Sequence, residues 1–353
     1  MSRSAELGSV RTTDGRPEGP PRLSPRTRVA LSTTLAAAAL SLTSLALIAR
    51  TQPIANMPGL MLAVGSPYLW LAAFAVLVAT ASRRRFLLSM VTVAVVAASL
   101  ALQISWYFLG RAPDVVAHQE IRVLSSNLRY GQADPHFLVK LANANADVIT
   151  VSELTPEEVQ RLHHAGVDAA FPYSHLLPAP GAGGIGMWSR YPLTVLSEPR
   201  HRWVSIPAAR VEIPGLRFAP LLASVHVYSP IAGDTNTVAE WRGGMASAKA
   251  QLDNFAKTAG PAAVIIGGDY NSTPDMRQFR DLLTNGYRDA VEQSGSGFAP
   301  TFPSNRRVPP LITIDHVLTR NAAAESVRTI KVPGSDHRAL LATIRVPIDP
   351  TTS

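Results

Sequence analysis

The feature that most constrains the fold is a set of three long apolar stretches in the first third of the chain. Residues 29–49, 59–81 and 86–110 hold no charged residue and are 21, 23 and 25 residues long. At about 1.5 Å per residue, each stretch can cross ~30 Å of hydrocarbon as a helix. Three transmembrane helices are therefore predicted, and a signal peptide fits less well because two more apolar stretches follow the first. Pro67 predicts a kink or a later start in the second helix.

The placement of arginine orients these helices. Three arginines occupy positions 83–85, after the second stretch, whereas the loop before the second stretch carries only Arg50. The leader carries Arg3, Arg11, Arg16, Arg22, Arg26 and Arg28. By the positive-inside rule, the leader and the 83–85 loop are cytoplasmic, so everything after residue 110 is predicted to be extracytoplasmic. Trp106 and Tyr107 suit either an aromatic belt at the outer surface or packing between helices.

Five segments follow from this pattern. Residues 1–28, rich in Arg, Pro, Gly and Ser, predict a disordered basic cytoplasmic tail. Residues 29–110 form the membrane domain, and residues 111–120 form a polar linker that keeps the next domain within about 35 Å of the bilayer. A second domain spans residues 121–346, and residues 347–353 form a tail.

The formal net charge of +8 does not indicate a DNA-binding surface. Residues 1–120 hold 11 Lys and Arg against 5 Asp and Glu, whereas residues 121–353 hold 22 against 20. Most of the excess charge therefore belongs to the membrane part, and duplex binding depends on a dense basic patch. The chain has no cysteine, which excludes disulfides and thiolate metal sites.

From residue 121 onward, short apolar runs mix with helical segments. Asp134 followed by Pro135 predicts a helix start, and Thr155 with Glu158 has capping-box spacing. Longer helices are expected at about 237–257 and 274–283. Strands are expected at residues 121–127, 146–153, 185–188, 209–213, 220–227, 263–266, 313–318 and 339–346. Many strands without strict alternation predict a four-layered α/β sandwich, in which two packed mixed β-sheets are flanked by helices.

Polar side chains gather at the ends of these strands, where they can converge on one cleft. They are Asn127, Glu153, His226, Asp269, Asn271, Asp315, Asp336 and His337. Oxygen ligands without thiolates favour Mg²⁺, Mn²⁺ or Ca²⁺ over zinc. His316 is expected to point to the opposite face from Asp315 and to be structural.

Asp269 and Asn271 in IIGGDYNSTP are separated by one residue at the end of an apolar run. In an extended strand, residues two apart project from the same face, so both side chains would enter one site while Tyr270 packs. The alternative is a turn stabilised by bonds from these side chains to the backbone.

Five motifs in order resemble the endonuclease/exonuclease/phosphatase superfamily. GDYNSTP resembles its Gly-Asp-x-Asn motif, TIDHVL its Ile-Asp-His motif and GSDHRAL its Ser-Asp-His motif. SSNLRYG resembles the first Asn motif, and ITVSELT the strand that ends in the metal-binding glutamate. The resemblance covers about residues 121–346 and implies a catalytic domain with the four-layered sandwich of that superfamily.

The resemblance also implies a metal site. Glu153 is expected to be the main metal carboxylate, with Asn127 beside it, and Asp336 is expected to complete the metal environment. Mg²⁺ is the expected cofactor, with Mn²⁺ and Ca²⁺ as alternatives.

Roles in hydrolysis follow from the same resemblance. Asp269 is expected to orient or deprotonate the attacking water, and Asn271 to donate hydrogen bonds to the phosphoryl oxygens. His337 is expected to contact the scissile phosphate, with Asp315 holding its ring. His226 is expected at the other phosphate contact, as a candidate acid for the leaving oxygen.

The sequence therefore predicts a multi-pass cell-membrane phosphoesterase that depends on a divalent metal and hydrolyses phosphodiesters by attack of an activated water. The expected substrate is a phospholipid or sphingolipid head group or a small phosphodiester. One alternative is an extracellular nuclease acting on DNA or RNA. An alternative of another class is an inactive membrane-bound binding module. The sequence indicates the bilayer and a phosphate ester as partners and no protein partner.

Overall fold

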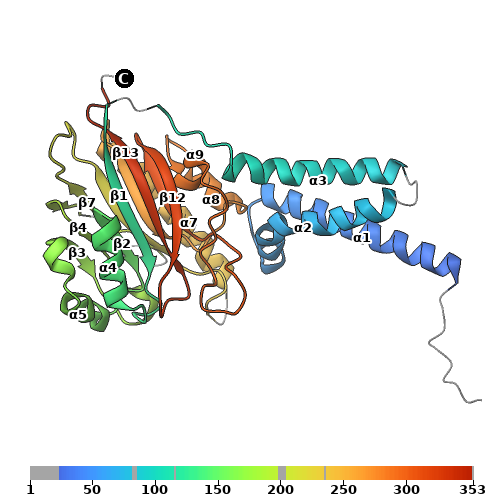
Figure 1. Ribbon diagram of the computed structural model, residues 1–353, viewed down its shortest axis with the longest axis horizontal. Helices are drawn as coiled ribbons and strands as arrows, with labels where there is room; N and C mark the ends of the chain where they lie inside the picture. The colour runs from blue at the N-terminus through green and yellow to red at the C-terminus, as the bar shows by residue number, and fades with distance from the viewer. Residues whose placement is uncertain (1–23, 82–85, 115–116, 198–203, 234–235, 352–353) are drawn as a thin grey trace, which may run out of the picture.

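The N-terminal third of the chain forms three long helices that project from one side of a sandwich domain (Figure 1). The computed structural model describes residues 24–81, 86–114, 117–197, 204–233 and 236–351. The helices are α1 (Pro25–Thr51), α2 (Met57–Ala81) and α3 (Phe86–Tyr107). All three are long and apolar enough to cross a membrane. Helix α2 continues through Pro67. Most of the predicted tail and the 83–85 arginines lie outside the described residues.

Two mixed β-sheets form the centre of the second domain. The six-stranded sheet has the order β12-β13-β1-β2-β4-β3, and the seven-stranded sheet the order β10-β11-β9-β8-β7-β5, with β6 paired to β8. The strands of the first sheet are β1 (His118–Asn127), β2 (Val148–Ser152), β3 (Tyr173–Leu177), β4 (Ile185–Ser189), β12 (Ala323–Lys331) and β13 (Arg338–Pro347). Those of the second are β5 (Leu193–Val195), β6 (Val204–Ser205), β7 (Ala208–Val211), β8 (Leu221–Val227), β9 (Val264–Asp269), β10 (Arg288–Asp289) and β11 (Asp315–Arg320).

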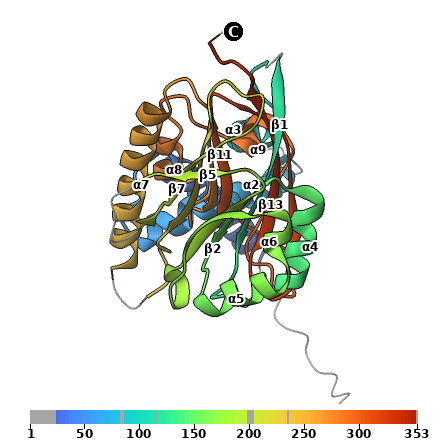
Figure 2. The ribbon, with the colours of Figure 1, turned by 90° about the vertical axis from the view of Figure 1, so that its left-hand side faces the viewer.

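Helices cover the outer face of each sheet, which completes four layers (Figure 2). The helices of this domain are α4 (Pro135–Asn145), α5 (Pro156–His164), α6 (Val167–Ala170), α7 (Thr237–Ala259), α8 (Arg277–Leu282) and α9 (Ala290–Ser294), with a 3₁₀ turn at Gly181–Gly183. In Figure 2, α7 and α8 lie on one side of the sheets, and α4 and α6 lie on the other. The predicted four-layered sandwich is therefore confirmed.

Local sequence signals set two of these helix starts. Asp134 caps α4 by accepting a hydrogen bond from the backbone nitrogen of Phe137 at 3.0 Å. Thr155 Oγ1 accepts one from the nitrogen of Glu158 at 3.2 Å at the start of α5. Both side chains satisfy backbone donors that a helix start leaves without partners, as the sequence predicted.

A glycine permits the close approach of the two sheets beneath the strand ends. A Cβ on Gly267 of β9 would lie 2.5 Å from Thr150 Oγ1 and 3.4 Å from the Cβ of Ser125 in the opposite sheet. Both neighbours are fully buried. A side chain at residue 267 would therefore push the sheets apart, just before the end of β9.

The three apolar helices are joined to the sandwich through buried polar contacts. Arg50, at the end of α1, forms an ion pair with Asp275 at 2.8 Å, with side chains only 8% and 3% exposed. The side chain of Gln278 in α8 accepts a hydrogen bond from the backbone nitrogen of Ile54 and donates one to the carbonyl of Ile54. Tyr107 of α3 is buried and stacks edge-on against Phe298. Tyr107 therefore packs against the sandwich domain, which neither of the two sequence interpretations, an aromatic belt or packing between helices, described.

We expect the buried ion pair to contribute strongly to stability. Arg50→Ala leaves Asp275 buried without its cation, and burial already raises the pKa of that carboxyl despite Arg50. The free energy of unfolding should fall by about 3–5 kcal/mol. Urea unfolding of the full chain in detergent measures this loss. Arg217→Ala, which removes an exposed pair with Asp349, is the control and should cost no more than about 1 kcal/mol. Equal losses for the two variants would contradict the account.

Candidate active site

The seven-stranded sheet sets three predicted site residues side by side. His226 of β8 pairs in register with Asp269 of β9, and Asp269 pairs with Asp315 of β11. β8 and β9 are parallel and end here, whereas β11 is antiparallel to β9 and begins here. The three side chains therefore lie at one edge of the sheet because the strand register places them there.

The six-stranded sheet brings the next residues to the same edge. Asn127 ends β1 opposite Ser152 of the parallel strand β2, and Glu153 follows Ser152. Asn127 connects the two sheets, because its Nδ2 donates to Glu153 Oε1 and to Asp269 Oδ2, both at 3.0 Å. One carboxamide thus fixes the separation of two carboxylates that come from different sheets.

Glu153 itself has a left-handed backbone conformation, with φ of +57°. A non-glycine residue in this region is uncommon and carries strain. Its second oxygen accepts a hydrogen bond at 2.8 Å from the backbone nitrogen of Tyr130. The chain therefore holds the Glu153 carboxylate against Asn127 and Tyr130.

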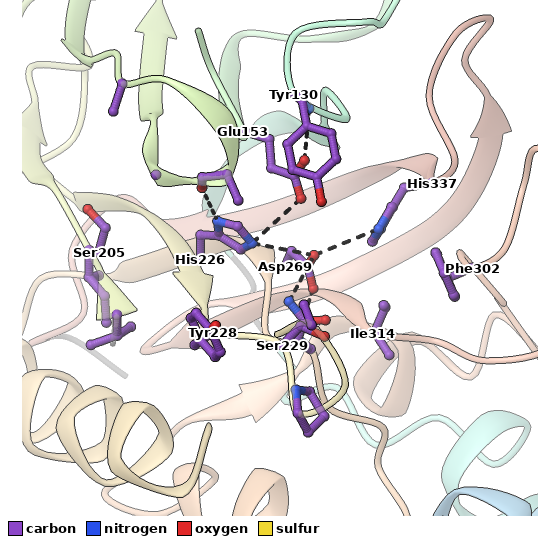
Figure 3. Close-up of a pocket in the computed structure, with 18 of the residues that line it drawn as sticks. Tyr130, Glu153, Ser205, His226, Tyr228, Ser229, Asp269, Phe302, Ile314 and His337 are labelled. Carbon is purple, nitrogen blue, oxygen red and sulfur yellow. Dashed lines mark hydrogen bonds and ion pairs between the residues drawn. The ribbon is translucent and has the colours of Figure 1, made fainter. Parts of the chain in front are cut away.

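The histidines face Asp269 from two sides of the cleft (Figure 3). The ring of His226 donates from Nδ1 to the carbonyl of Ala182 at 3.0 Å. Its Nε2 therefore points inward, 3.9 Å from both Glu153 Oε1 and Asp269 Oδ2. On the other side, His337 Nε2 lies 3.8 Å from Asp269 Oδ2.

Hydrogen bonds fix His337 through both its ring and its backbone. Nδ1 contacts Asp315 Oδ2 at 2.7 Å, and the backbone nitrogen donates to Ser335 Oγ at 3.0 Å. Burial opposes a charge on this ring, but Asp315 and Asp269 outweigh that effect and raise the pKa of His337 to about 10. At neutral pH the ring is therefore an imidazolium that presents Nε2–H to the cleft.

Asp269 is a buried carboxyl among charged neighbours. Burial and the negative charge of Asp315 raise its pKa to about 6, against the opposing effect of His337 and His226. Its Oδ1 accepts a hydrogen bond from the nitrogen of Asn271 at 2.7 Å. At neutral pH the group is mainly ionised and keeps a raised affinity for a proton, as a general base requires.

The backbone at Asn271 differs from the expected extended strand. β9 ends at Asp269, and Asn271 has a φ of +45°. Asp269 and Asn271 therefore reach one cleft through a turn and not through strand alternation. Asn271 Nδ2 donates to the carbonyl of Val227 at 2.9 Å and lies 3.3 Å from Asp269 Oδ2. Tyr270 is buried, as expected.

Asp336 is the most loosely connected of the eight predicted residues. It lines the cleft, and its carboxylate lies 3.9 Å from the guanidinium of Arg129, with about a quarter of its side chain exposed. The cleft also holds Glu153, His226, Asp269, Asn271 and His337. Asn127 and Asp315 lie directly behind them, hydrogen-bonded to Asp269 and His337. All eight residues therefore meet at one edge of the two sheets.

The donor set at this edge fits a hard divalent cation. Glu153 Oε1 and Asp269 Oδ2 share the same amide donor, and the surrounding acids outnumber the histidines. Ligand atoms of Asp269, Asp315 and His337 also lie within 4.8 Å of one another. However, a protonated His337 has no lone pair for a metal at Nε2. The carboxylate of Glu153 therefore fits a cation better than that second group. Asn127 presents its Nδ2 to Glu153, while its Oδ1 accepts a hydrogen bond from the backbone nitrogen of Arg129 at 2.8 Å, so its carboxamide must turn over to offer an oxygen to the same cation.

Two residues that support the site were not predicted from the sequence. Tyr130 has a φ of +53°, donates its backbone N–H to Glu153 and exposes its ring at the cleft. Ser335 Oγ donates to the carbonyl of Asn127 and accepts from the nitrogen of His337, so it ties the first motif to the last. Ser335 could have been predicted, because it lies within the Ser-Asp-His motif. Tyr130 could not, because its backbone N–H makes the contact and the residue type does not reveal this.

His316 is fully buried outside the cleft. Its ring contacts Asp289 through Nδ1 and the carbonyl of Ser272 through Nε2. As expected from its position in β11, it is structural.

Comparisons with known proteins agree with this arrangement. A model of the Endonuclease/Exonuclease/phosphatase family matches residues 112–337. A humanized D. rerio TDP2 with 14 mutations is 18% identical, with a TM-score of 0.51, covering 64% of this chain and 98% of that chain. An endonuclease/exonuclease/phosphatase from Bacteroides vulgatus is 16% identical, with a TM-score of 0.50, covering 65% and 99%. At these identities the two structures show a shared fold. No curated protein matches the chain.

Proposed function

The chain belongs to the endonuclease/exonuclease/phosphatase family, and we propose that it is a membrane-anchored, Mg²⁺-dependent phosphodiesterase. Its proposed substrate is a phospholipid or sphingolipid head group or a small phosphodiester. The observation that carries the proposal is the convergence of Glu153, Asp269 and His337 with their supporting residues at one sheet edge. A binding module that performs no hydrolysis has no physical need for this buried, charged cluster, because burying charges is costly.

The proposed reaction assigns a role to each side of the cleft. Asp269 accepts a proton from the attacking water, which its raised pKa favours. His337 places a positive N–H against a phosphoryl oxygen, and Asp315 keeps the ring charged and oriented. His226, whose ring is fixed by Ala182, is the candidate acid for the leaving oxygen. Asn271 Nδ2 has two hydrogens, which contact the carbonyl of Val227 and Asp269 Oδ2, so donation to the phosphate requires one of these contacts to be exchanged for one with the substrate.

Glu153, Asn127 and Asp336 are the residues proposed to hold Mg²⁺. A divalent cation here would neutralise charge that develops on the phosphate during attack. The resting carboxylate of Glu153 accepts hydrogen bonds from Asn127 and from the backbone of Tyr130. Its remaining lone pairs stay available for a cation.

The described part of the cleft lining supports a lipid or a small phosphodiester as the substrate. The cleft has a volume of about 1290 Å³, and none of the described residues that line it is Lys or Arg. Binding to a polyanionic strand relies on such residues along the groove. Apolar side chains are frequent among the lining residues, which suits an amphiphilic or small phosphodiester.

The anchor supports a location at the cell membrane. Three apolar helices precede the catalytic domain, and the arginines of the leader and of the 83–85 loop favour a cytoplasmic position for those segments. We therefore propose that the catalytic domain is extracytoplasmic.

A substrate panel tests the proposed class. The purified full chain with Mg²⁺ is incubated with sphingomyelin, phosphatidylinositol, bis(p-nitrophenyl) phosphate, plasmid DNA and RNA. We expect hydrolysis of bis(p-nitrophenyl) phosphate and of at least one lipid, faster than cleavage of either nucleic acid. EDTA should abolish this activity. Rapid cleavage of DNA or RNA with no lipid turnover would overturn the proposed substrate class and show that the protein is a nuclease.

A further inference from the structure

The cleft extends from the catalytic residues to the second membrane helix. Leu60, Met61 and Val64 of α2 line the same cavity as Asp269 and His337. Ile206, Ile231 and Ile312 from the sandwich line it as well. The catalytic cluster therefore lines one part of the cavity, and apolar residues line another. Some of these apolar residues belong to helix α2. We name this region, lined by these six apolar residues, the apolar groove.

The first turns of α2 are integrated into the sandwich domain. Leu60 is 1% exposed and Ala63 is fully buried, and both belong to one hydrophobic cluster with Trp241, Met276 and Phe279. Tyr68 donates its hydroxyl hydrogen to the carbonyl of Leu311. The apolar groove is therefore built on packed, fixed structure.

This docking limits how far α2 extends beyond the domain. After Tyr68 the apolar stretch continues to Ala81, before the arginines at positions 83–85, and this part of the helix is about 20 Å long. The hydrocarbon core of a bilayer is ~30 Å thick. For α2 to cross it, the face of the domain that holds the groove must lie at the bilayer surface or partly within it. The groove then opens toward lipid.

Apolar side chains around the groove support the same position. Met61 is 54% exposed, Ile231 is 58% exposed and Leu311 is 46% exposed. Clustered exposed apolar residues of this size on a protein mark a binding surface or a membrane contact. Their position beside α2 favours the membrane.

We propose that the apolar groove holds a hydrocarbon chain of a phosphate ester that remains anchored in the bilayer, while its head group reaches Asp269 and His337. This inference rests on the proposed phosphodiesterase activity and adds the recognition element. The substrate then enters from the leaflet along α2. Its hydrocarbon chain lies against Met61 and Ile231, while its phosphate lies between His226 and His337. Burying methylene groups in the groove provides affinity that a short-chain ester cannot gain.

A chain-length series tests the inference. The full chain in phosphatidylcholine nanodiscs hydrolyses methyl, butyl and octyl p-nitrophenyl phosphodiesters, which share one scissile bond and one leaving group. We expect kcat/KM for the octyl ester to exceed that for the methyl ester about tenfold or more. In Met61→Glu the octyl-to-methyl ratio should fall about tenfold, because a carboxylate faces the chain. Ile231→Glu, on the part of the groove that belongs to the sandwich domain, should give the same fall.

The change of this ratio between a variant and the wild type separates the groove from effects on folding and on lipid partitioning, because each ester partitions into the bilayer to the same extent for every variant. Ile348→Glu is the matched control, because Ile348 is 42% exposed and lies outside the cleft lining, and its ratio should equal that of the wild type. If both groove variants keep the wild-type ratio, the inference is wrong while the phosphodiesterase proposal stands. If the wild type does not hydrolyse even the methyl ester, the proposed function itself fails.

Discussion

Asp269→Asn is expected to reduce kcat for bis(p-nitrophenyl) phosphate by about 10²–10⁴-fold. Asparagine has nearly the same shape and can still accept the hydrogen bond from the nitrogen of Asn271, so the turn after β9 is retained. It cannot take a proton from water. Steady-state hydrolysis with saturating Mg²⁺ measures the loss.

Two observations would separate a chemical effect of this change from a structural one. Removing a buried carboxylate close to Asp315 relieves an unfavourable charge, but it also removes the Oδ2 acceptor for Asn127, so the melting temperature should fall only slightly while activity is lost. Asp253→Asn, which changes a partly exposed aspartate on α7, should keep full activity. Near-wild-type turnover in Asp269→Asn would exclude the carboxylate from the reaction.

Asp315→Asn should have the second-largest effect, through His337. The raised pKa keeps the His337 ring charged below about pH 10, and the charge is lost as the pH rises through that value. Without the Asp315 carboxylate, the pKa of the ring falls, because burial is then opposed mainly by Asp269, and the tautomer is no longer fixed by a carboxylate. We expect kcat to fall about 10²–10⁴-fold at pH 8. The alkaline limb of the pH–rate profile should also move to lower pH.

A second buried aspartate–histidine pair provides the matched control. Asp289 contacts His316 with both side chains fully buried, but His316 lies outside the cleft. Asp289→Asn should lower stability while leaving the alkaline limb of the pH–rate profile where the wild type has it. A shift of that limb in Asp289→Asn, or its absence in Asp315→Asn, would contradict the assigned role of Asp315.

Local signals in the sequence predicted most of the sandwich. The caps at Asp134 and Thr155 are satisfied within the first turn of each helix, so residue type alone is sufficient there. Strands with continuous apolar runs, such as β8 and β9, were also predictable. Strand β12 was missed, because it is an edge strand with exposed Glu325 and Ser326 and depends for pairing on β13.

The parts of the site that depend on long-range geometry were harder to predict. Motif order predicted which residues meet, because each motif follows or precedes a strand. The left-handed turn at Asn271 was only the alternative interpretation of this motif, because an Asp and an Asn two residues apart also fit the end of an extended strand. The contact of α2 with the cleft was also beyond prediction, because a stretch that is apolar throughout has no pattern to distinguish a lipid-facing turn from a domain-facing one.

The most direct test of the account is the Mg²⁺ dependence of phosphodiester hydrolysis by the purified full chain. Turnover of bis(p-nitrophenyl) phosphate is followed while Mg²⁺ is titrated into wild-type protein previously treated with EDTA, in parallel with Asp269→Asn. The account predicts no turnover without metal, saturable activation by Mg²⁺ in the wild type and loss of at least about 99% of that activity in the variant. Turnover that is independent of metal, or equal in the two proteins, would contradict it.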